Sequence, residues 1–156
     1  MKIAISCDHR GAHLHRALTE LVEQHGHEAV PVPTCSGACG DYPDFAYVVG
    51  QTVAEGRADL GILMCGSGIG MSIAANKIRG IRAALVQDEI SAEMSRRHND
   101  ANVLCLSADM LGFRLVEKIV AIWLETEFEG GRHARRVSKI AAIEAGENPA
   151  AVTAGS

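Results

Sequence analysis

The feature that most constrains the fold is a change of hydrophobic period across a glycine-rich loop in the middle of the chain. Residues 59–65 read Asp-Leu-Gly-Ile-Leu-Met-Cys, an apolar run typical of a strand buried on both faces of a parallel sheet. Residues 66–70 read Gly-Ser-Gly-Ile-Gly, and residues 71–78 then favour a helix. A buried strand that leads through glycines into a helix indicates an α/β protein.

The same alternation of strand and helix continues along the chain. Strands are predicted at 2–7, 28–32, 59–65, 81–86 and 103–106, and helices at 12–25, 42–55, 71–78, 89–98, 111–125 and 132–145. This order predicts a three-layer, Rossmann-like α/β sandwich with a mostly parallel five-stranded sheet flanked by helices. At 156 residues one core is expected, with a single domain at 1–146 and a flexible C-terminal tail at 147–156.

Composition excludes several classes of partner. The net charge of -4 argues against a general binder of nucleic acid or anionic membranes, so any anion site must be local. Aromatic residues make up only 4% of the chain, which leaves few side chains for stacking on bases. The N-terminus lacks a signal-peptide pattern, and no apolar run approaches the roughly 18 residues of a membrane span. We therefore expect a cytoplasmic protein with neither nucleic-acid nor membrane partners.

The cysteines predict reduced thiols rather than a disulfide framework. Five are present, an odd number, at positions 7, 35, 39, 65 and 105. In a chain without an export signal most of them should be free. Cys35 and Cys39 lack a second Cys or His pair at metal-ligand spacing, so no metal site is predicted there.

The loop at residues 66–70 is a candidate anion site. Backbone N–H groups converge where a strand passes through glycines into a helix, and the helix dipole favours negative charge at that point. The spacing does not match a dinucleotide fingerprint, which needs glycine where this chain has Met71, and it lacks the lysine of a P-loop. A tight turn with glycines for packing alone is the alternative.

Cys65 is the last residue of the predicted strand before this loop. A thiol beside backbone N–H groups and a helix N-terminus is in an environment that favours the reactive thiolate. Most free cysteines are instead small buried apolar side chains. Position alone leaves both interpretations open.

Three other polar groups are candidates. Asp8 and His9 follow the first strand at the same edge as Cys65, where they suit a sugar hydroxyl and an anion, or else form a helix cap with an exposed histidine. His98 is a general acid or base, or it complements the dipole at a helix end. Arg132 and Arg136 lie four residues apart on one helix, so they share a face that suits phosphate or is simply solvated.

Together these segments resemble the ribose 5-phosphate isomerase type B family, whose relatives isomerise galactose 6-phosphate and allose 6-phosphate. The resemblance extends from about residue 2 to 145 in register. The matching segments are Cys-Asp-His-Arg-Gly at 7–11, Asp-Tyr-Pro-Asp at 41–44, Gly-Ile-Leu-Met-Cys-Gly-Ser-Gly-Ile-Gly-Met-Ser-Ile-Ala-Ala-Asn-Lys at 61–77, Gly-Ile-Arg-Ala-Ala at 80–84, Ser-Arg-Arg-His-Asn-Asp-Ala-Asn-Val-Leu at 95–104 and Glu-Gly-Gly-Arg-His-Ala-Arg-Arg-Val at 129–137.

The resemblance implies an aldose–ketose isomerisation without metal or cofactor, in a homodimer or homotetramer whose active sites lie at subunit interfaces. Ribose 5-phosphate is the expected substrate. Cys65 would be the base that forms a cis-enediolate, since the position at which some members carry a glutamate base is Met71 here. The other implied roles are a proton relay for Ser67, ring opening by His98 with help from Asp8, oxyanion stabilisation by the amides of Gly66, Gly68, Ile69 and Gly70, sugar binding by Asn99, and phosphate binding by His9, Arg132 and Arg136.

One position departs from the family pattern. The family typically carries a phosphate-binding arginine where this chain has Asp109. A carboxylate about 4 Å from the phosphate would cost about 4 kcal/mol at an effective dielectric of 20. Three explanations stay open: Asp109 caps the following helix, Arg114 or another basic residue replaces the lost charge, or the substrate is another sugar, such as a hexose 6-phosphate or a tetrose phosphate. As an alternative to an active isomerase, this chain would be a non-catalytic partner subunit.

Overall fold

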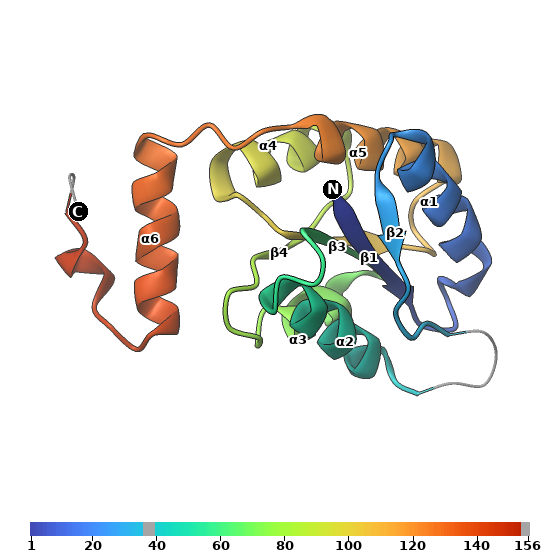
Figure 1. The fold of residues 1–156 in the computed structure, drawn as a ribbon, viewed down its shortest axis with the longest axis horizontal. Helices are drawn as coiled ribbons and strands as arrows, with labels where there is room; N and C mark the ends of the chain where they lie inside the picture. The colour runs from blue at the N-terminus through green and yellow to red at the C-terminus, as the bar shows by residue number, and fades with distance from the viewer. Residues whose placement is uncertain (36–39, 154–156) are drawn as a thin grey trace.

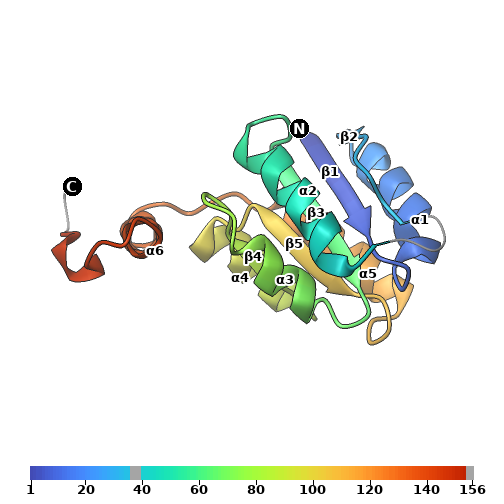
Figure 2. The same ribbon diagram turned by 90° about the horizontal axis from the view of Figure 1, so that it is seen from below.

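The computed structural model describes residues 1–35 and 40–153. Its centre is a five-stranded parallel sheet in the order β2-β1-β3-β5-β4, with helices on both faces (Figures 1 and 2). The strands are β1 (Lys2–Cys7), β2 (Glu28–Val30), β3 (Leu60–Cys65), β4 (Ala83–Leu85) and β5 (Val103–Ser107). The helices are α1 (Ala12–Gln24), α2 (Tyr42–Ala54), α3 (Ile69–Ala75), α4 (Glu89–Asn99), α5 (Phe113–Glu125) and α6 (Arg132–Glu144). The predicted α/β sandwich is confirmed.

Strand β3 is the central strand of the sheet. All six of its residues are buried, and it pairs with β1 on one side and β5 on the other. One apolar cluster joins the sheet to α1, α4 and α5 around the fully buried Trp123, and a second joins the opposite face to α2 and α3 around Met71. Burial on both faces explains why the strand is apolar throughout rather than alternating.

Helix α6 does not cover the sheet. In both ribbon views it stands beside the α4 and β4 end of the molecule, reached by an extended segment after α5 (Figures 1 and 2). Ile140 and Ile143 on this helix are exposed, whereas His133 near its start is buried. The sequence predicted the helix but not its separate position.

Several predicted boundaries were wrong, for local reasons. Strand β2 ends at Val30 rather than 32, because Pro31 has no N–H for the ladder. Helix α3 begins at Ile69, earlier than predicted, because the left-handed turn at Gly68 completes the loop two residues sooner. Helix α5 begins only at Phe113, since Gly112 is still extended.

The cysteine prediction holds for most of the described cysteines. Cys7, Cys65 and Cys105 are free, but Cys35 is disulfide-bonded, so the prediction was wrong for that residue; Cys39 lies outside the described residues.

Near the chain end lies a short 3-10 helix, Pro149–Ala151, where the Pro149 carbonyl oxygen accepts a hydrogen bond from Lys139 Nζ at 2.9 Å. Across residues 1–35 and 40–153, no helix combines the length and apolarity needed to span a bilayer.

Candidate functional site

The carboxyl edge of the sheet gathers three of the predicted segments. Cys65 and Ser107 are register partners at the ends of β3 and β5, and Cys7 pairs with Met64 at the end of β1. Residues 8–9, 66–70 and 108–109 follow these three strands directly. Parallel strands therefore place Asp8, the glycine loop and Asp109 at one edge.

Cys65 lies under the glycine loop. Its side chain is buried, and the Gly68 N–H donates to Sγ at 3.2 Å. Two other thiols lie in strands that are also buried, and burial raises the pKa of both Cys7 and Cys105. Within this group of free thiols, the hydrogen bond to a loop amide distinguishes Cys65.

The loop depends on its glycines. Gly68 has φ of 75°, and a Cβ there would lie 3.0 Å from the carbonyl carbon and oxygen of Leu106. Gly70 packs against the Tyr42 ring, which a Cβ would approach to 2.7 Å at Cζ. The Ile69 N–H donates to Ser67 Oγ at 3.3 Å. The backbone is thus held close to β5 and α2, with its shape fixed by contacts that larger residues would disrupt.

Asp8 organises the turn after β1. This buried carboxylate accepts hydrogen bonds at Oδ1 from the N–H groups of Arg10 at 2.8 Å and Gly11 at 3.3 Å. Gly11, not Asp8, is the N-cap of α1. The turn fixes where His9 and Arg10 leave the sheet.

Asp109 forms an ion pair across the loop. Both of its oxygens accept from Arg10, with Nε at 3.2 and 3.1 Å and Nη2 at 2.8 Å. The carboxylate lies over the loop, since a Cβ at Gly66 would be 2.9 Å from Asp109 Oδ2. Helix α5 has Gly112 as its N-cap without a side-chain cap, so the explanation that Asp109 caps this helix was wrong.

His98 and Asn99 lie at the opposite edge. They end α4, just before β5 begins, and the start of β5 pairs with Gly61 near the start of β3. Along β3, the distance from Gly61 to Cys65, four residues further on, is about 13 Å. One chain therefore does not bring His98 or Asn99 to Cys65.

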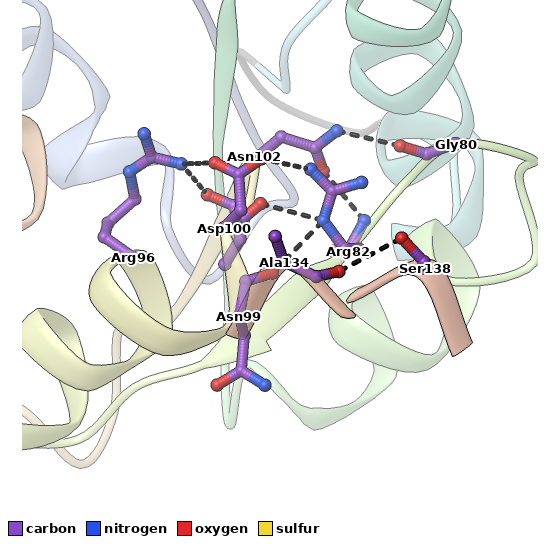
Figure 3. Close-up of polar contacts among 9 residues, drawn as sticks. Gly80, Arg82, Arg96, Asn99, Asp100, Asn102, Ala134 and Ser138 are labelled. Carbon is purple, nitrogen blue, oxygen red and sulfur yellow. Dashed lines mark hydrogen bonds and ion pairs between the residues drawn. The ribbon is translucent and has the colours of Figure 1, made fainter. Parts of the chain in front are cut away.

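A polar network fixes the end of α4 (Figure 3). Asp100 has a left-handed backbone, φ 46°, which is uncommon for a residue other than glycine. Its carboxylate bridges Arg82 at 2.9 Å and Arg96 at 3.0 Å, while Arg82 Nε donates to the Asn99 and Asp100 carbonyl oxygens. The Asn99 amide points away from this network (Figure 3). The network positions Asn99 without occupying its side chain.

His98 also connects α4 to α6. Its ring stacks on that of His133, with centroids 4.1 Å apart and planes 2° from parallel. Glu129 lies 3.9 Å from His98 and 3.8 Å from His133, measured from carboxylate oxygen to Nε2, and it pairs with Arg97 at 2.8 Å. Burial lowers the pKa of His133, and the neighbouring His98 adds to this effect.

The cluster of His98, Glu129 and His133 is the one group of potential metal ligands within 4.8 Å of one another in residues 1–35 and 40–153. Its geometry does not suit an ion. Histidine binds a metal through a lone pair in the ring plane, and two parallel stacked rings share no common plane. Arg97 Nε also donates a hydrogen bond to Glu129 Oε2 at 2.8 Å. The cluster instead joins two helices.

Comparison with known proteins identifies the family. A family model described as Ribose/Galactose Isomerase matches residues 3–140. The ribose-5-phosphate isomerase B of Escherichia coli is 47% identical over 148 residues, which cover 94% of this chain and 99% of that protein. This chain belongs to the ribose/galactose isomerase family. It is an aldose–ketose isomerase of sugar phosphates.

Relatives within the family are named for different sugar phosphates. The D-erythrulose-4-phosphate isomerase of Pectobacterium atrosepticum is 40% identical, with 92% of this chain and 95% of that protein covered. The solved structure of the Clostridium thermocellum ribose-5-phosphate isomerase B matches with a TM-score of 0.90 at 46% identity, covering 94% and 99% of the two chains. Fold and family are therefore clear, and the sugar is a separate question.

In this member of the ribose/galactose isomerase family the predicted site residues form two groups. The carboxyl-edge group is defined here as Cys65, the loop at 66–70, Asp8, His9 and Asp109, and its members lie together at one edge of the sheet. The α4–α6 group, defined here as His98, Asn99, Arg132 and Arg136, lies at the opposite edge, where both arginines are exposed.

Sequence reasoning missed three residues near these groups. Arg10 was given no role, although its charge is opposite to that of Asp109. Tyr42 was part of the quoted family segment, but only the contact with Gly70 shows where it packs. Glu129 also lay in a quoted segment, and its place between two histidines depends on the meeting of α4 and α6.

Proposed function

We propose that this chain interconverts ribose 5-phosphate and ribulose 5-phosphate through a cis-enediolate, with Cys65 as the base. The observation that carries the proposal is the Cys65 sulfur beneath the glycine loop, held by the Gly68 N–H at 3.2 Å. Met71, at the place where some relatives use glutamate, is fully buried and cannot accept a proton. Cys65 is the group with suitable chemistry at this position.

Two side chains move the protons of the reaction: Cys65 acts on the carbon atoms and Ser67 on the oxygen atoms. The Cys65 thiolate removes the proton from C2 of the aldose, the C–H electron pair forms the C1–C2 double bond, and the carbonyl electrons move to O1. Ser67 transfers the O2 proton to O1, and Cys65 returns its proton to C1, which leaves the ketose carbonyl at C2. Amide N–H groups of the loop stabilise the negative oxygen, commonly the largest single contribution to such a rate.

The proposed active site combines the carboxyl-edge group of one subunit with the α4–α6 group of a second copy. His98 of that copy would open the furanose ring as an acid while Asp8 binds a hydroxyl, and Asn99 would hold the sugar. Arg132 and Arg136 would bind phosphate together with His9. A homodimer is supported by exposed apolar side chains near both groups, namely Ile69 and Ile73 on α3 and Ile140 and Ile143 on α6.

A tetrose 4-phosphate is the second candidate substrate. Asp109 stands where the family pattern has a phosphate-binding arginine, and one relative is named for erythrulose 4-phosphate. A tetrose whose O4 carries phosphate cannot close a furanose ring through that oxygen. Such a substrate would need Cys65 but not ring opening by His98.

The proposal is tested with the purified chain and a panel of pentose, hexose and tetrose phosphates, by ketose formation and by exchange of the substrate proton with deuterated solvent. Turnover and exchange are expected with ribose 5-phosphate, and Cys65→Ala should lower kcat by about a hundredfold or more while keeping the fold. Cys105→Ala, which removes a thiol from the core, is the control. Substantial turnover by Cys65→Ala would refute the assignment of the base.

The proposed chemistry needs neither metal nor cofactor, because cysteine, serine and backbone amides supply every step. Dialysis against a chelator should leave kcat unchanged. A loss of activity that a divalent cation restores would contradict this part of the proposal.

A further inference from the structure

We propose that Arg10, held by Asp109, binds the phosphate of the substrate and replaces the arginine that the family pattern has at position 109. This inference rests on the proposed function, and it explains how a carboxylate is tolerated beside a phosphate site. It assigns phosphate binding to Arg10 and a positioning role to Asp109.

The position of Arg10 supports this assignment. It follows His9, a proposed phosphate ligand, on a turn fixed by Asp8, whose Oδ1 accepts the Arg10 N–H at 2.8 Å. Its side chain lies beside the glycine loop, since a Cβ at Gly66 would be 3.7 Å from Arg10 Cγ. The guanidinium therefore extends from the rim of the loop, where a substrate bound over Cys65 would carry its phosphate.

The ion pair orients Arg10 without using all of its donors. Nε and Nη2 bind the two Asp109 oxygens in a fork, and guanidinium has five N–H groups, so those of Nη1 remain for a second anion. Both side chains are about half exposed, at 55% and 41%. A phosphate in solution can reach the outer side of the guanidinium.

The charges explain why Asp109 needs Arg10. Alone, the carboxylate would repel a phosphate, but the fork neutralises it and fixes the arginine. An exposed ion pair contributes little to the stability of the fold. If this pair had only a structural role, removing Arg10 would leave the affinity for substrate unchanged. Substrate affinity is therefore the property that separates the two roles.

The test measures KM and kcat with ribose 5-phosphate, and the affinity for inorganic phosphate by calorimetry. Arg10→Ala should raise KM about tenfold to a hundredfold and weaken phosphate binding similarly, with a much smaller change in kcat. In the Arg10→Ala background, Asp109→Ala should recover part of the loss, and Asp109→Arg should recover most of it. Asp109→Ala alone should raise KM less than Arg10→Ala, because the cation remains but loses its orientation.

Arg57→Ala is the matched control, since Arg57 forms a similarly exposed ion pair with Glu55 at 2.7 Å. An unchanged KM and phosphate affinity in Arg10→Ala would overturn the inference. A lower KM in Asp109→Ala would overturn the positioning role of Asp109, because the carboxylate would then oppose binding. Absence of turnover by the unmodified chain on every sugar phosphate would refute the proposed function, while the calorimetry would still decide the role of Arg10.

Discussion

The two edges of the sheet are built in different ways. At the carboxyl edge, Cys65 ends a buried strand and the other polar groups follow such a strand by one to five residues, so the ladder itself determines where Cys65, Asp8 and the loop lie. At the amino edge, His98 and the arginines of α6 depend on side-chain contacts between two helices, chiefly the stack of His98 on His133. The first group is preorganised by the backbone, whereas the second is completed by side chains and, as proposed, by a second subunit.

A mixing experiment tests this division with the largest expected effect. Cys65→Ala and His98→Ala subunits should each be nearly inactive as homodimers. After unfolding and refolding together, mixed dimers would contain one site with neither substitution, so activity should return to about a quarter of the unmodified level. Recovery is measured as kcat against the subunit ratio. If each active site lay within one chain, mixing would restore nothing.

Gly68→Ala tests the preorganised edge. The left-handed φ and the 3.0 Å approach to Leu106 should together cost about 1–3 kcal/mol in the free energy of unfolding and displace the amide that binds Cys65. Denaturant unfolding measures the stability, and kcat should fall with it. Gly80→Ala is the control: it has φ of +83° with nothing within 4 Å of the added Cβ, so it should cost about 1 kcal/mol and leave kcat intact.

Asp100→Ala tests the network that ends α4. Arg82 and Arg96 would both lose their carboxylate partner, at an expected cost of about 1–2 kcal/mol in the free energy of unfolding. Because His98 and Asn99 precede this residue, activity on ribose 5-phosphate should fall as well. Turnover of a tetrose 4-phosphate should fall less, since no ring opens. Equal loss on both substrates would argue against a role of the network in placing His98.

The smallest expected effect concerns pH. Burial lowers the pKa of His133, so the folded state binds fewer protons than the unfolded state as pH falls below about 6.5. Stability should therefore decrease from pH 7.5 towards pH 5, and the decrease ends below the folded pKa. His98, Arg132 and Arg136 oppose protonation, and Glu129 favours it.

His133→Phe keeps a stacked ring but cannot titrate, so the acid-induced drop in melting temperature should be smaller than in the unmodified chain. His13→Phe, at an exposed position on α1, is the control. An identical drop in His133→Phe and the unmodified chain would show that this histidine does not contribute to the pH dependence.

The sequence predicted the carboxyl edge well because the relevant distances are short along the chain. A buried apolar strand, a glycine loop and a following helix are recognisable from local period and composition, and they place Cys65 correctly. The ion pair between Arg10 and Asp109 was missed because its partners are 99 residues apart. Local sequence patterns do not predict which charged side chains, far apart in the sequence, form an ion pair.

The family resemblance and the alternating pattern of this sequence determined the fold class, the loop and the candidate base. Only the tertiary structure decided that Asp109 pairs with Arg10 rather than capping α5, that α6 stands apart from the sheet, and that His98 lies at the edge opposite Cys65. The physical reason is that period and propensity act over a few residues, whereas ion pairs, helix docking and the sharing of a site depend on packing between segments distant in the chain.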